Sequence, residues 1–456
     1  MKADEVVALI QSQIVSGVLT AGDRLPTHRD MAWDLKCSVG TVTRAYGDLE
    51  RRGIIYGHVG RGTFVASQTG GVQSPLASFD KGTRQFAVDI DLSLNRFHHP
   101  ENTIDFSNAL RALADRSPQS GYGDYIDTRG RNSDIQVAVR WLKSLIGEVK
   151  PANVMVTHGA QSGLYLAMKA LAKYGDTIAT ESFGYPGIKA AAQEIGLKLH
   201  AVEMDEYGMI PEAFRMAVRR ARVKLLVTVP TNHNPTGTTL PLQRRLEIVK
   251  IAQAADIPII EDGVYAPFQE IEVPSYYEID PENNVFLTSF SKVFSPGLRV
   301  GYIVAPDGMI PRLVSSMKAI NWTTSAVTLD LIAQLLEVGT IASHRDDLIA
   351  EGQIRFKIAK QILSPWMTEG QLTQAQFLPH LWLRLPRSST PSEIIERARD
   401  AGIALIGGDR FAMSRQLDDY FIRVCLMAVP ARASLVDALR ILGGLLSQED
   451  MQSLIS

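Results

Sequence analysis

Hydrophobic residues in the first 66 positions recur at helical spacing and then give way to short extended runs. The pattern predicts a first helix near the N-terminus and a short second helix after Pro26, with Thr27 as its N-cap. A third helix is expected to begin near Val39, with its apolar residues on one face. Two short strands, 54–56 and 63–65, follow it. Three helices followed by a two-stranded ribbon predict a winged helix-turn-helix.

The rest of the chain alternates between apolar runs and helical segments. Most of the runs are continuously hydrophobic, which is typical of strands buried on both faces of a mainly parallel sheet covered by helices. The expected strands are 154–157, 177–180, 224–229, 257–260, 285–288 and 300–304. We therefore predict an α/β fold for this region.

These patterns divide the chain into three parts. Residues 1–66 form the predicted winged helix, and residues 88–456 form the α/β region, with a small C-terminal subdomain from about 346 to 456. Residues 67–87 are rich in Gly, Ser, Thr and Gln, a composition that predicts a flexible linker. A length of 456 residues agrees with more than one domain.

Composition and charge narrow the function classes. A net charge of -2 provides no overall basic field for nucleic acid or a membrane surface, so DNA contact must be local. No signal peptide and no bilayer-spanning apolar run is recognisable, and we expect a soluble, cytoplasmic protein without membrane contact. Cys37 and Cys425 lie far apart, and no Cys/His spacing suits a metal, so no metal site is expected.

A lysine among serines marks the strongest candidate for chemistry. Lys292 follows a predicted strand, lies between Ser289, Ser291 and Ser295, and is followed by Arg299 seven positions on. Lysine amines form Schiff bases with aldehyde cofactors such as pyridoxal 5'-phosphate (PLP). The phosphate of this cofactor favours hydroxyl donors and a planar guanidinium. In isolation the stretch would be read as a solvated loop lysine.

Polar residues also follow two neighbouring strands. Asn234 comes after strand 224–229, and Asp262 and Tyr265 come after strand 257–260. Because ligands of open α/β sheets bind outside the carboxyl ends of the strands, we expect these loops to meet the lysine in one crevice. There a carboxylate can hold a pyridinium proton, and an amide and a phenol can hold a ring oxygen. Each residue alone is also compatible with a turn or a helix cap.

The first 66 residues resemble the DNA-binding domain of the GntR family. The resemblance lies in 22–26, Arg29, 40–46 and 60–65, and it implies binding of double-stranded operator DNA. The residues that it implies for DNA contact are Thr27, Arg29, Thr41, Arg44, Arg61 and Gly62. A winged helix used for protein contacts is the alternative.

Two positions depart from the GntR pattern. Val39 stands where the family usually has an arginine, and Lys36 stands at a helix break where it usually has glycine. Residues 1–66 hold 8 Lys and Arg against 7 Asp and Glu, a net charge of 8 − 7 = +1. Because of Val39, we expect an operator sequence that differs from those typical of the family. Because of the low net charge, we expect modest non-specific affinity for DNA, so that the protein must bind as a dimer.

The region from 88 onward resembles fold-type I PLP enzymes of the aspartate aminotransferase family. The resemblance implies that Lys292 forms the Schiff base and that Asp262 holds the pyridine nitrogen. It implies that Tyr265 and Asn234 hold the phenolic oxygen of the cofactor. The phosphate cup implied by the resemblance consists of Ser289, Ser291, Arg299 and the backbone amides of Ala160 and Gln161.

Further roles follow from the same resemblance. Tyr185 resembles the aromatic residue that stacks on the cofactor ring, with Phe183 as its rival. Arg423 resembles the arginine that binds a substrate α-carboxylate, although a surface arginine is the alternative. Tyr125 or Tyr122 resembles a tyrosine that reaches the phosphate of a partner subunit, which implies a homodimer.

The combination of both regions resembles the MocR subfamily of bacterial regulators. It implies a PLP-dependent transcriptional regulator that senses an amine, an amino acid or PLP itself through an aldimine at Lys292. The alternative is a catalytically active aminotransferase that carries a DNA-binding head. We favour the sensor, with weak transaminase activity at most, because an enzyme alone has no use for residues 1–66.

Overall fold

The structure is a computed structural model, and it divides the chain into two compact units. Unit 1 comprises Met1–Thr83 and unit 2 comprises Arg84–Ser456. The division falls within the expected linker, which lies outside the described residues. The residues described are 3–15, 19, 23–51, 54–58, 62–65, 89–99, 102–115, 122–269, 273–374, 377–386, 389–414 and 420–455.

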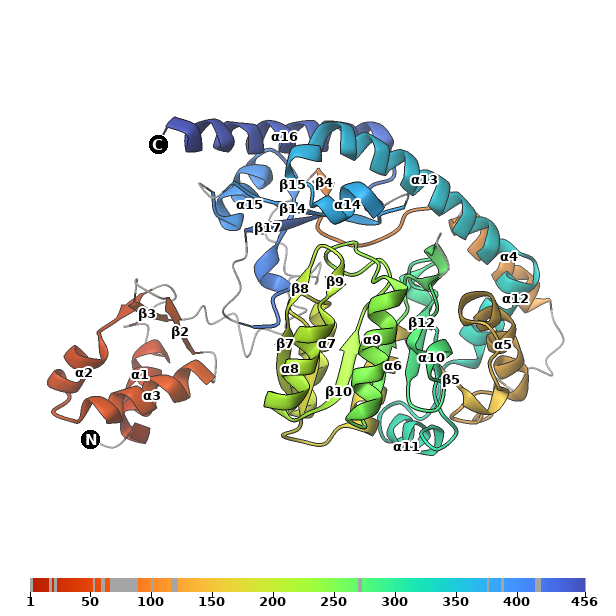
Figure 1. The fold of residues 1–456 in the computed structure, drawn as a ribbon, viewed down its shortest axis with the longest axis horizontal. Coiled ribbons are helices and arrows are strands. Elements are labelled where there is room, and N and C mark those ends of the chain that lie inside the picture. The colour runs from red at the N-terminus through yellow and green to blue at the C-terminus, as the bar shows by residue number, and fades with distance from the viewer. Residues whose placement is uncertain are drawn as a thin grey trace. The chain divides into compact units, whose positions relative to one another are not determined.

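Unit 1 has the helix and strand order expected of a winged helix, with one additional strand. The short strand β1 pairs antiparallel with β3, so that the described sheet has the order β1-β3-β2. A two-residue strand carries no alternation of its own, which is why the hydrophobic pattern misses it. The elements are α1 (Ala3–Val15), β1 (Arg24–Leu25), α2 (His28–Asp34), α3 (Val39–Arg51), β2 (Ile55–His58) and β3 (Gly62–Val65) (Figure 1).

The helices of unit 1 pack through their apolar faces, and local polar groups fix their ends. Val6, Ile10 and Val42 are among the fully buried residues of this core. The Thr27 hydroxyl accepts a hydrogen bond from the Asp30 backbone N–H at 3.3 Å, which confirms the predicted N-cap of α2.

Lys36 takes the left-handed conformation, with a φ of 48°, in the turn between α2 and α3. A side chain in this conformation costs about 1 kcal/mol, because its Cβ crowds the following carbonyl oxygen. Lys36→Gly is therefore expected to stabilise unit 1 by about 1 kcal/mol. Hydrogen exchange of the α2 and α3 amides should then slow about fivefold, whereas Lys36→Ala, which keeps a Cβ, should not change the rates. Unchanged rates in Lys36→Gly would contradict the argument.

The large sheet of unit 2 confirms the predicted α/β fold. Its strand order is β5-β13-β12-β11-β10-β6-β7, and its pairs are parallel except those of β13, which runs antiparallel to β12 and β5. The edge strand β7 is absent from the expected set. The strands are β5 (Val154–Thr157), β6 (Thr177–Glu181), β7 (Lys198–Val202), β10 (Val223–Thr228), β11 (Ile259–Asp262), β12 (Val285–Ser289) and β13 (Gly301–Val304).

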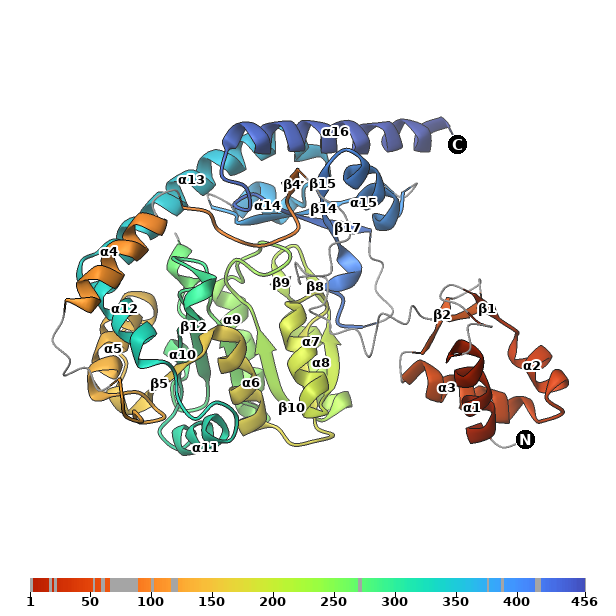
Figure 2. The same cartoon turned by 180° about the vertical axis from the view of Figure 1, so that it is seen from behind.

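Helices cover both faces of this sheet (Figures 1 and 2). Side chains along β10 alternate between two cores, with Leu225 and Val227 in one and Leu226 in the other. The helices of the large part are α4 (Asn102–Ala114), α5 (Asn132–Ile146), α6 (Gly159–Leu171), α7 (Pro186–Ile195), α8 (Pro211–Ala221), α9 (Leu242–Ala254), α10 (Tyr276–Ile279), α11 (Ile310–Ile320) and α12 (Ala326–Glu337). A small hairpin, β8 (Met204–Asp205) and β9 (Gly208–Met209), lies between β7 and α8.

A smaller C-terminal part has a core of its own. The antiparallel sheet β14-β17-β16 packs with helices, and β15 pairs in parallel with β4, which comes from the start of unit 2. The expected boundary near 346 falls inside the long helix α13. The elements are β4 (Ile90–Asp91), α13 (Thr340–Leu363), α14 (Glu369–Gln374), β14 (His380–Arg384), α15 (Pro391–Asp400), β15 (Ile403–Ala404), β16 (Ile406–Gly407), β17 (Phe421–Cys425) and α16 (Arg432–Ile455).

Among the described helices, none is by itself long and apolar enough to cross a bilayer. The bent pair of α12 and α13 meets the length and composition requirements only when the two helices are taken together.

Candidate functional site

The loops that follow β10, β11 and β12 converge with β17 of the smaller part. Arg423 of β17 donates through Nη1 to the Asn234 Oδ1 at 2.7 Å. Asp262 ends β11, and its charge and that of Lys292 each shift the pKa of the other group. The structure thus brings together the predicted Lys292, Asp262, Asn234 and Arg423.

Lys292 lies half-buried in the loop after β12. Its Nζ donates a hydrogen bond to the backbone oxygen of Asn95 and lies 5.9 Å from the centre of the Phe97 ring. Burial, and secondarily the charge of Arg423, lowers the pKa of the Lys292 amine to about 8. A lysine with a lowered pKa is a better nucleophile toward an aldehyde at neutral pH, because more of it is unprotonated.

The lowered pKa predicts a pH dependence of cofactor capture. Because the pKa of Lys292 falls from 10.5 to about 8, the reactive unprotonated fraction should rise about tenfold per pH unit up to pH 8 and then level off. The rate of PLP incorporation into PLP-free protein, followed by absorbance from pH 6 to 10, measures this. Free lysine in solution is the control, and its rate should keep rising to about pH 10. A protein rate that rises in parallel with the control would contradict the prediction.

Asp262 and Tyr265 are buried near the lysine. Asp262 accepts a hydrogen bond from the Val264 N–H at 3.2 Å, and burial raises the pKa of its carboxyl to about 6. Burial also raises the pKa of the Tyr265 hydroxyl. A cationic partner such as a pyridinium would hold the Asp262 carboxyl in its ionised form. These properties suit a group that binds a protonated ring nitrogen.

Asn95 is a site residue that the sequence did not reveal. Its amide donates to the Tyr265 hydroxyl at 2.6 Å and lies 3.2 Å from Nδ1 of His380. His380 in turn donates from Nε2 to the His233 carbonyl at 3.1 Å. Burial keeps the pKa of His380 well below its usual value, so the ring is neutral with its proton on Nε2. Asn95 and His380 therefore complete the lining around Lys292 and Tyr265.

A cradle for an anion forms where α6 begins. Gly159 has a φ of +78°, and a Cβ at this position would lie 3.0 Å from the Arg299 Nη2. Arg299 also takes a left-handed φ of 51° and donates to the His158 carbonyl at 3.2 Å. Because no side chain caps α6 at His158, the N–H groups of Ala160 and Gln161 remain available to a phosphate.

The serines of the lysine stretch differ in their surroundings. The Ser289 hydroxyl is buried and accepts a hydrogen bond from the Ser291 N–H at 3.4 Å. The Ser291 side chain is only half-buried. Behind them, a Cβ at Gly301 would lie 2.6 Å from the Thr288 carbonyl oxygen and 3.0 Å from Gly159, so only glycine allows this close approach of β13.

Tyr185 and Phe183 lie in different surroundings. Burial, and secondarily the charge of Asp262, raises the pKa of Tyr185 to about 12. Phe183 instead packs against Trp382 and Phe421, with ring centres 5.3 and 5.9 Å apart. Tyr185 is therefore the better placed of the two for stacking on a ring that lies above Asp262.

Arg423 is buried, which rules out the alternative of a surface arginine. Only 1% of the residue is exposed, and its guanidinium lies 4.7 Å from the centre of the Phe411 ring. Besides Asn234, it donates through Nη2 to the Ser93 carbonyl at 2.7 Å. This places a buried cation where a carboxylate could pair with it.

Tyr125 and Tyr122 are both exposed. Tyr125 is 86% exposed and packs against Trp322 at 5.9 Å between ring centres, and Tyr122 is 44% exposed.

The residues expected to contact DNA differ in how far their side chains are exposed. Arg29 and Arg44 are exposed, and the exposed Thr27 hydroxyl donates to the Asp30 carboxylate at 2.6 Å. Thr41 is only 9% exposed, and its hydroxyl lies 2.8 Å from that of Ser38, which caps α3 by accepting from the Thr41 N–H at 3.1 Å. Gly62 begins β3, and Arg61 lies outside the described residues.

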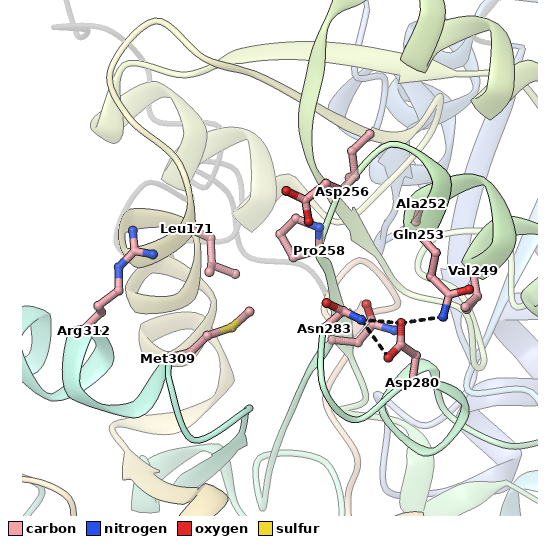
Figure 3. A pocket seen from close by; sticks show the side chains of 12 residues that line it. Leu171, Val249, Ala252, Gln253, Asp256, Pro258, Asp280, Asn283, Met309 and Arg312 are labelled. Atoms are coloured by element: carbon pink, nitrogen blue, oxygen red, sulfur yellow. Dashed lines mark hydrogen bonds between the residues drawn. The ribbon is translucent and has the colours of Figure 1, made fainter.

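A separate cavity of about 350 Å³ lies at the opposite, amino ends of β11 and β12 (Figure 3). Asp280 on its wall already accepts hydrogen bonds from Gln253 and Asn283, each at 2.9 Å. Within the described residues, no group of three or more His, Cys, Asp or Glu side chains is arranged to hold a metal.

Comparison with known proteins identifies both units. The model of the class I and II aminotransferases matches residues 87–429, and that of the GntR family of bacterial regulatory proteins matches residues 2–65. The HTH-type transcriptional regulator TauR of Rhodobacter capsulatus is 28% identical over 440 residues, 88% of each chain. The aromatic amino acid aminotransferase C1773.13 of Schizosaccharomyces pombe is 31% identical but covers 57% of this chain and 58% of its own.

Solved structures agree with the fold of unit 2. An archaeal alanine:glyoxylate aminotransferase superposes with a TM-score of 0.74 at 21% identity, over 82% of this chain and 96% of its own. LysN, the α-aminoadipate aminotransferase of Thermus thermophilus, solved with N-(5'-phosphopyridoxyl)-L-leucine, superposes with a TM-score of 0.71 at 23% identity. It covers 80% of this chain and 93% of its own.

Class I and II aminotransferases use PLP, and the residues of this site fit that cofactor. The amine of Lys292, the carboxyl of Asp262 and the cradle around Gly159 and Arg299 match its aldehyde, ring nitrogen and phosphate. When bound, the cofactor supplies an electrophilic carbon for amines. The chain belongs to the class I and II aminotransferase family and carries an N-terminal GntR-type helix-turn-helix domain, the arrangement of the MocR subfamily.

Proposed function

We propose that this protein is a PLP-dependent transcriptional regulator. Unit 1 binds double-stranded operator DNA, and unit 2 binds a small amine or amino acid that changes the affinity for that DNA. The full-length similarity to TauR, named as a transcriptional regulator, supports this proposal over an aminotransferase with a DNA-binding head. We also propose a cytoplasmic location, because a regulator must reach its operator DNA.

One observation carries the proposal: the segment of residues 91–99 contacts both cations of the site. The Ser93 carbonyl accepts from Arg423 at 2.7 Å, and the Asn95 carbonyl accepts from Nζ of Lys292. These two cations are the groups expected to hold the ligand carboxylate and the cofactor. Ligand and cofactor therefore compete with backbone oxygens of this segment.

The same segment lies directly after the linker that leads from unit 1. It is held to the smaller part of unit 2 by the pairing of Ile90 with Ile403, and by Leu92, which donates to the Ala404 carbonyl at 3.0 Å. A change at Ser93 and Asn95 thus acts close in sequence to the predicted linker. A ligand changes DNA affinity only by binding one arrangement of this segment better than another.

The test uses the full chain loaded with PLP and an operator selected from random duplexes. A panel of amino acids and amines is added while operator affinity and hydrogen exchange of residues 91–99 are measured. We expect one ligand class to change the Kd by about 5–150-fold and to raise exchange in this segment. Constant DNA affinity with sustained amino transfer to a keto acid would instead favour the enzyme.

We further propose that the protein acts as a homodimer. Tyr125 and Trp322 form an exposed aromatic pair, 86% and 52% accessible, which a second copy of unit 2 would cover. Tyr125, rather than the less exposed Tyr122, would then reach the phosphate site of the partner. Sedimentation of the PLP-loaded protein tests the dimer. Tyr125→Phe should weaken PLP binding, and Tyr122→Phe should not.

A further inference from the structure

The first turn of α3 exposes methyl groups. Val39 is the first residue of the helix and is 45% exposed. Beside it, a Cβ added to Gly40 would meet nothing nearer than the Ser38 Oγ at 3.9 Å, so the surface around Val39 is open. The opposite side of α3 is buried through Val42, Ala45 and other core residues. Val39 therefore faces away from the core of unit 1.

Thr43 continues this surface one helical turn later. Its hydroxyl donates to the Val39 carbonyl at 3.0 Å and lies 3.1 Å from Nδ1 of His28. Because the hydroxyl is engaged within unit 1, the methyl group of Thr43 is the part best able to contact another molecule. Val39 and Thr43 together form a small apolar ridge, which we call the methyl ridge.

Exposed cations lie on the same two helices as Thr43 and its contact His28. Arg44 is exposed, and its Nε donates to the Gly40 carbonyl at 3.3 Å. Arg29 on α2 is exposed as well. Neither arginine forms an ion pair with a carboxylate in the described part of the chain. An apolar ridge on a surface that also carries exposed cations fits a polyanion with an apolar group near its phosphates.

In a helix-turn-helix, the N-terminal residues of the second helix contact base edges in the major groove. The apolar group that bases present there is the C5-methyl group of thymine. We infer that Val39 and Thr43 read a thymine methyl, and that the operator carries a thymine opposite the first turn of α3 in each half-site. This inference rests on the proposed DNA-binding function and specifies which base unit 1 selects.

The test replaces single thymines of the selected operator by uracil, which lacks only the methyl group. With the PLP-loaded full chain, uracil at one position per half-site should weaken binding about fourfold, as expected for one exposed methyl group. Val39→Ala should weaken binding to the thymine operator by a similar factor. The uracil effect should disappear in this variant, because the partner of the methyl group is gone. Val338→Ala, an exposed valine of unit 2 (61%), is the matched control and should bind like the original protein.

The outcomes separate this inference from the proposed function. A protein that prefers its operator but tolerates uracil at every position overturns the role of the methyl ridge and leaves DNA binding intact. A uracil effect that persists unchanged in Val39→Ala also overturns it. A protein without preference for any sequence over random DNA contradicts the proposed function itself.

Discussion

Lys292→Ala is expected to lose the bound cofactor on desalting and to abolish the effect of any ligand on DNA affinity. The Lys292 amine can bond covalently to an aldehyde, and burial lowers the pKa of this amine to about 8. Removing it also takes the Lys292 hydrogen bond away from the Asn95 carbonyl. The ligand-dependent change of Kd should fall from about 5–150-fold to none. Absorbance after desalting and operator titrations with and without ligand measure both effects.

Lys318→Ala is the matched control, since this lysine is exposed on α11. It should retain both the cofactor and the response. A Lys292→Ala protein that is folded by circular dichroism and still responds to the ligand would refute the assignment of sensing to this lysine.

Arg245→Ala is expected to destabilise unit 2 by about 3–5 kcal/mol, because it leaves a buried carboxylate without its cation. The Arg245 side chain is completely buried and lies 3.6 Å from Glu261. It donates to the carbonyls of Pro230 and Leu240, at 3.2 and 3.1 Å, and so holds the loop that carries Asn234. Urea unfolding of the full chain measures the loss. PLP affinity should fall with it, because this loop lines the site.

The loss in Arg245→Ala should grow with pH. Burial raises the pKa of Glu261 from 4.5 to about 7, while Arg245 acts in the opposite direction. A carboxyl with a raised pKa favours the folded state when protonated, and this contribution is lost as pH rises through the folded pKa. Without Arg245 the pKa rises further, so the penalty should be larger at pH 8 than at pH 5.

The neighbouring Arg244 provides the control for this prediction. It pairs with Asp205 at 2.7 Å, with 23% of its side chain exposed. Arg244→Ala should cost about 1 kcal/mol, as half-solvated ion pairs do. Equal losses for both variants, or a penalty for Arg245→Ala that does not change with pH, would show that burial of Glu261 is not the cause.

The strands of the large sheet could be predicted because continuous burial leaves a strong local signal. Six of its strands were expected within two residues of their observed bounds, and the polar residues at their ends led to Lys292, Asp262 and Asn234. The edge strand β7 was missed because its burial is partial, with Lys198 exposed.

Asn95 and His380 could not be predicted, because their contacts join distant parts of the chain. Asn95 meets Tyr265 and His380 across 170 and 285 positions. No local pattern indicates pairs at such separations.

Thr41 shows a different limit of sequence-based prediction. Helical periodicity puts Thr41 on the polar face of α3, yet its hydroxyl lies beside that of Ser38. Thr43 is the exposed threonine.

Two backbone carbonyls of residues 91–99 accept hydrogen bonds from the two cations that are expected to hold the ligand and the cofactor. Ser93 and Asn95 each occupy one cation, so a simple carboxylate would challenge only Arg423, and an aldehyde would challenge only Lys292. A molecule that engages both ends displaces the segment completely, and one that engages a single end leaves the other carbonyl in place. On the proposed function, we therefore expect the largest response when cofactor and carboxylate are bound together.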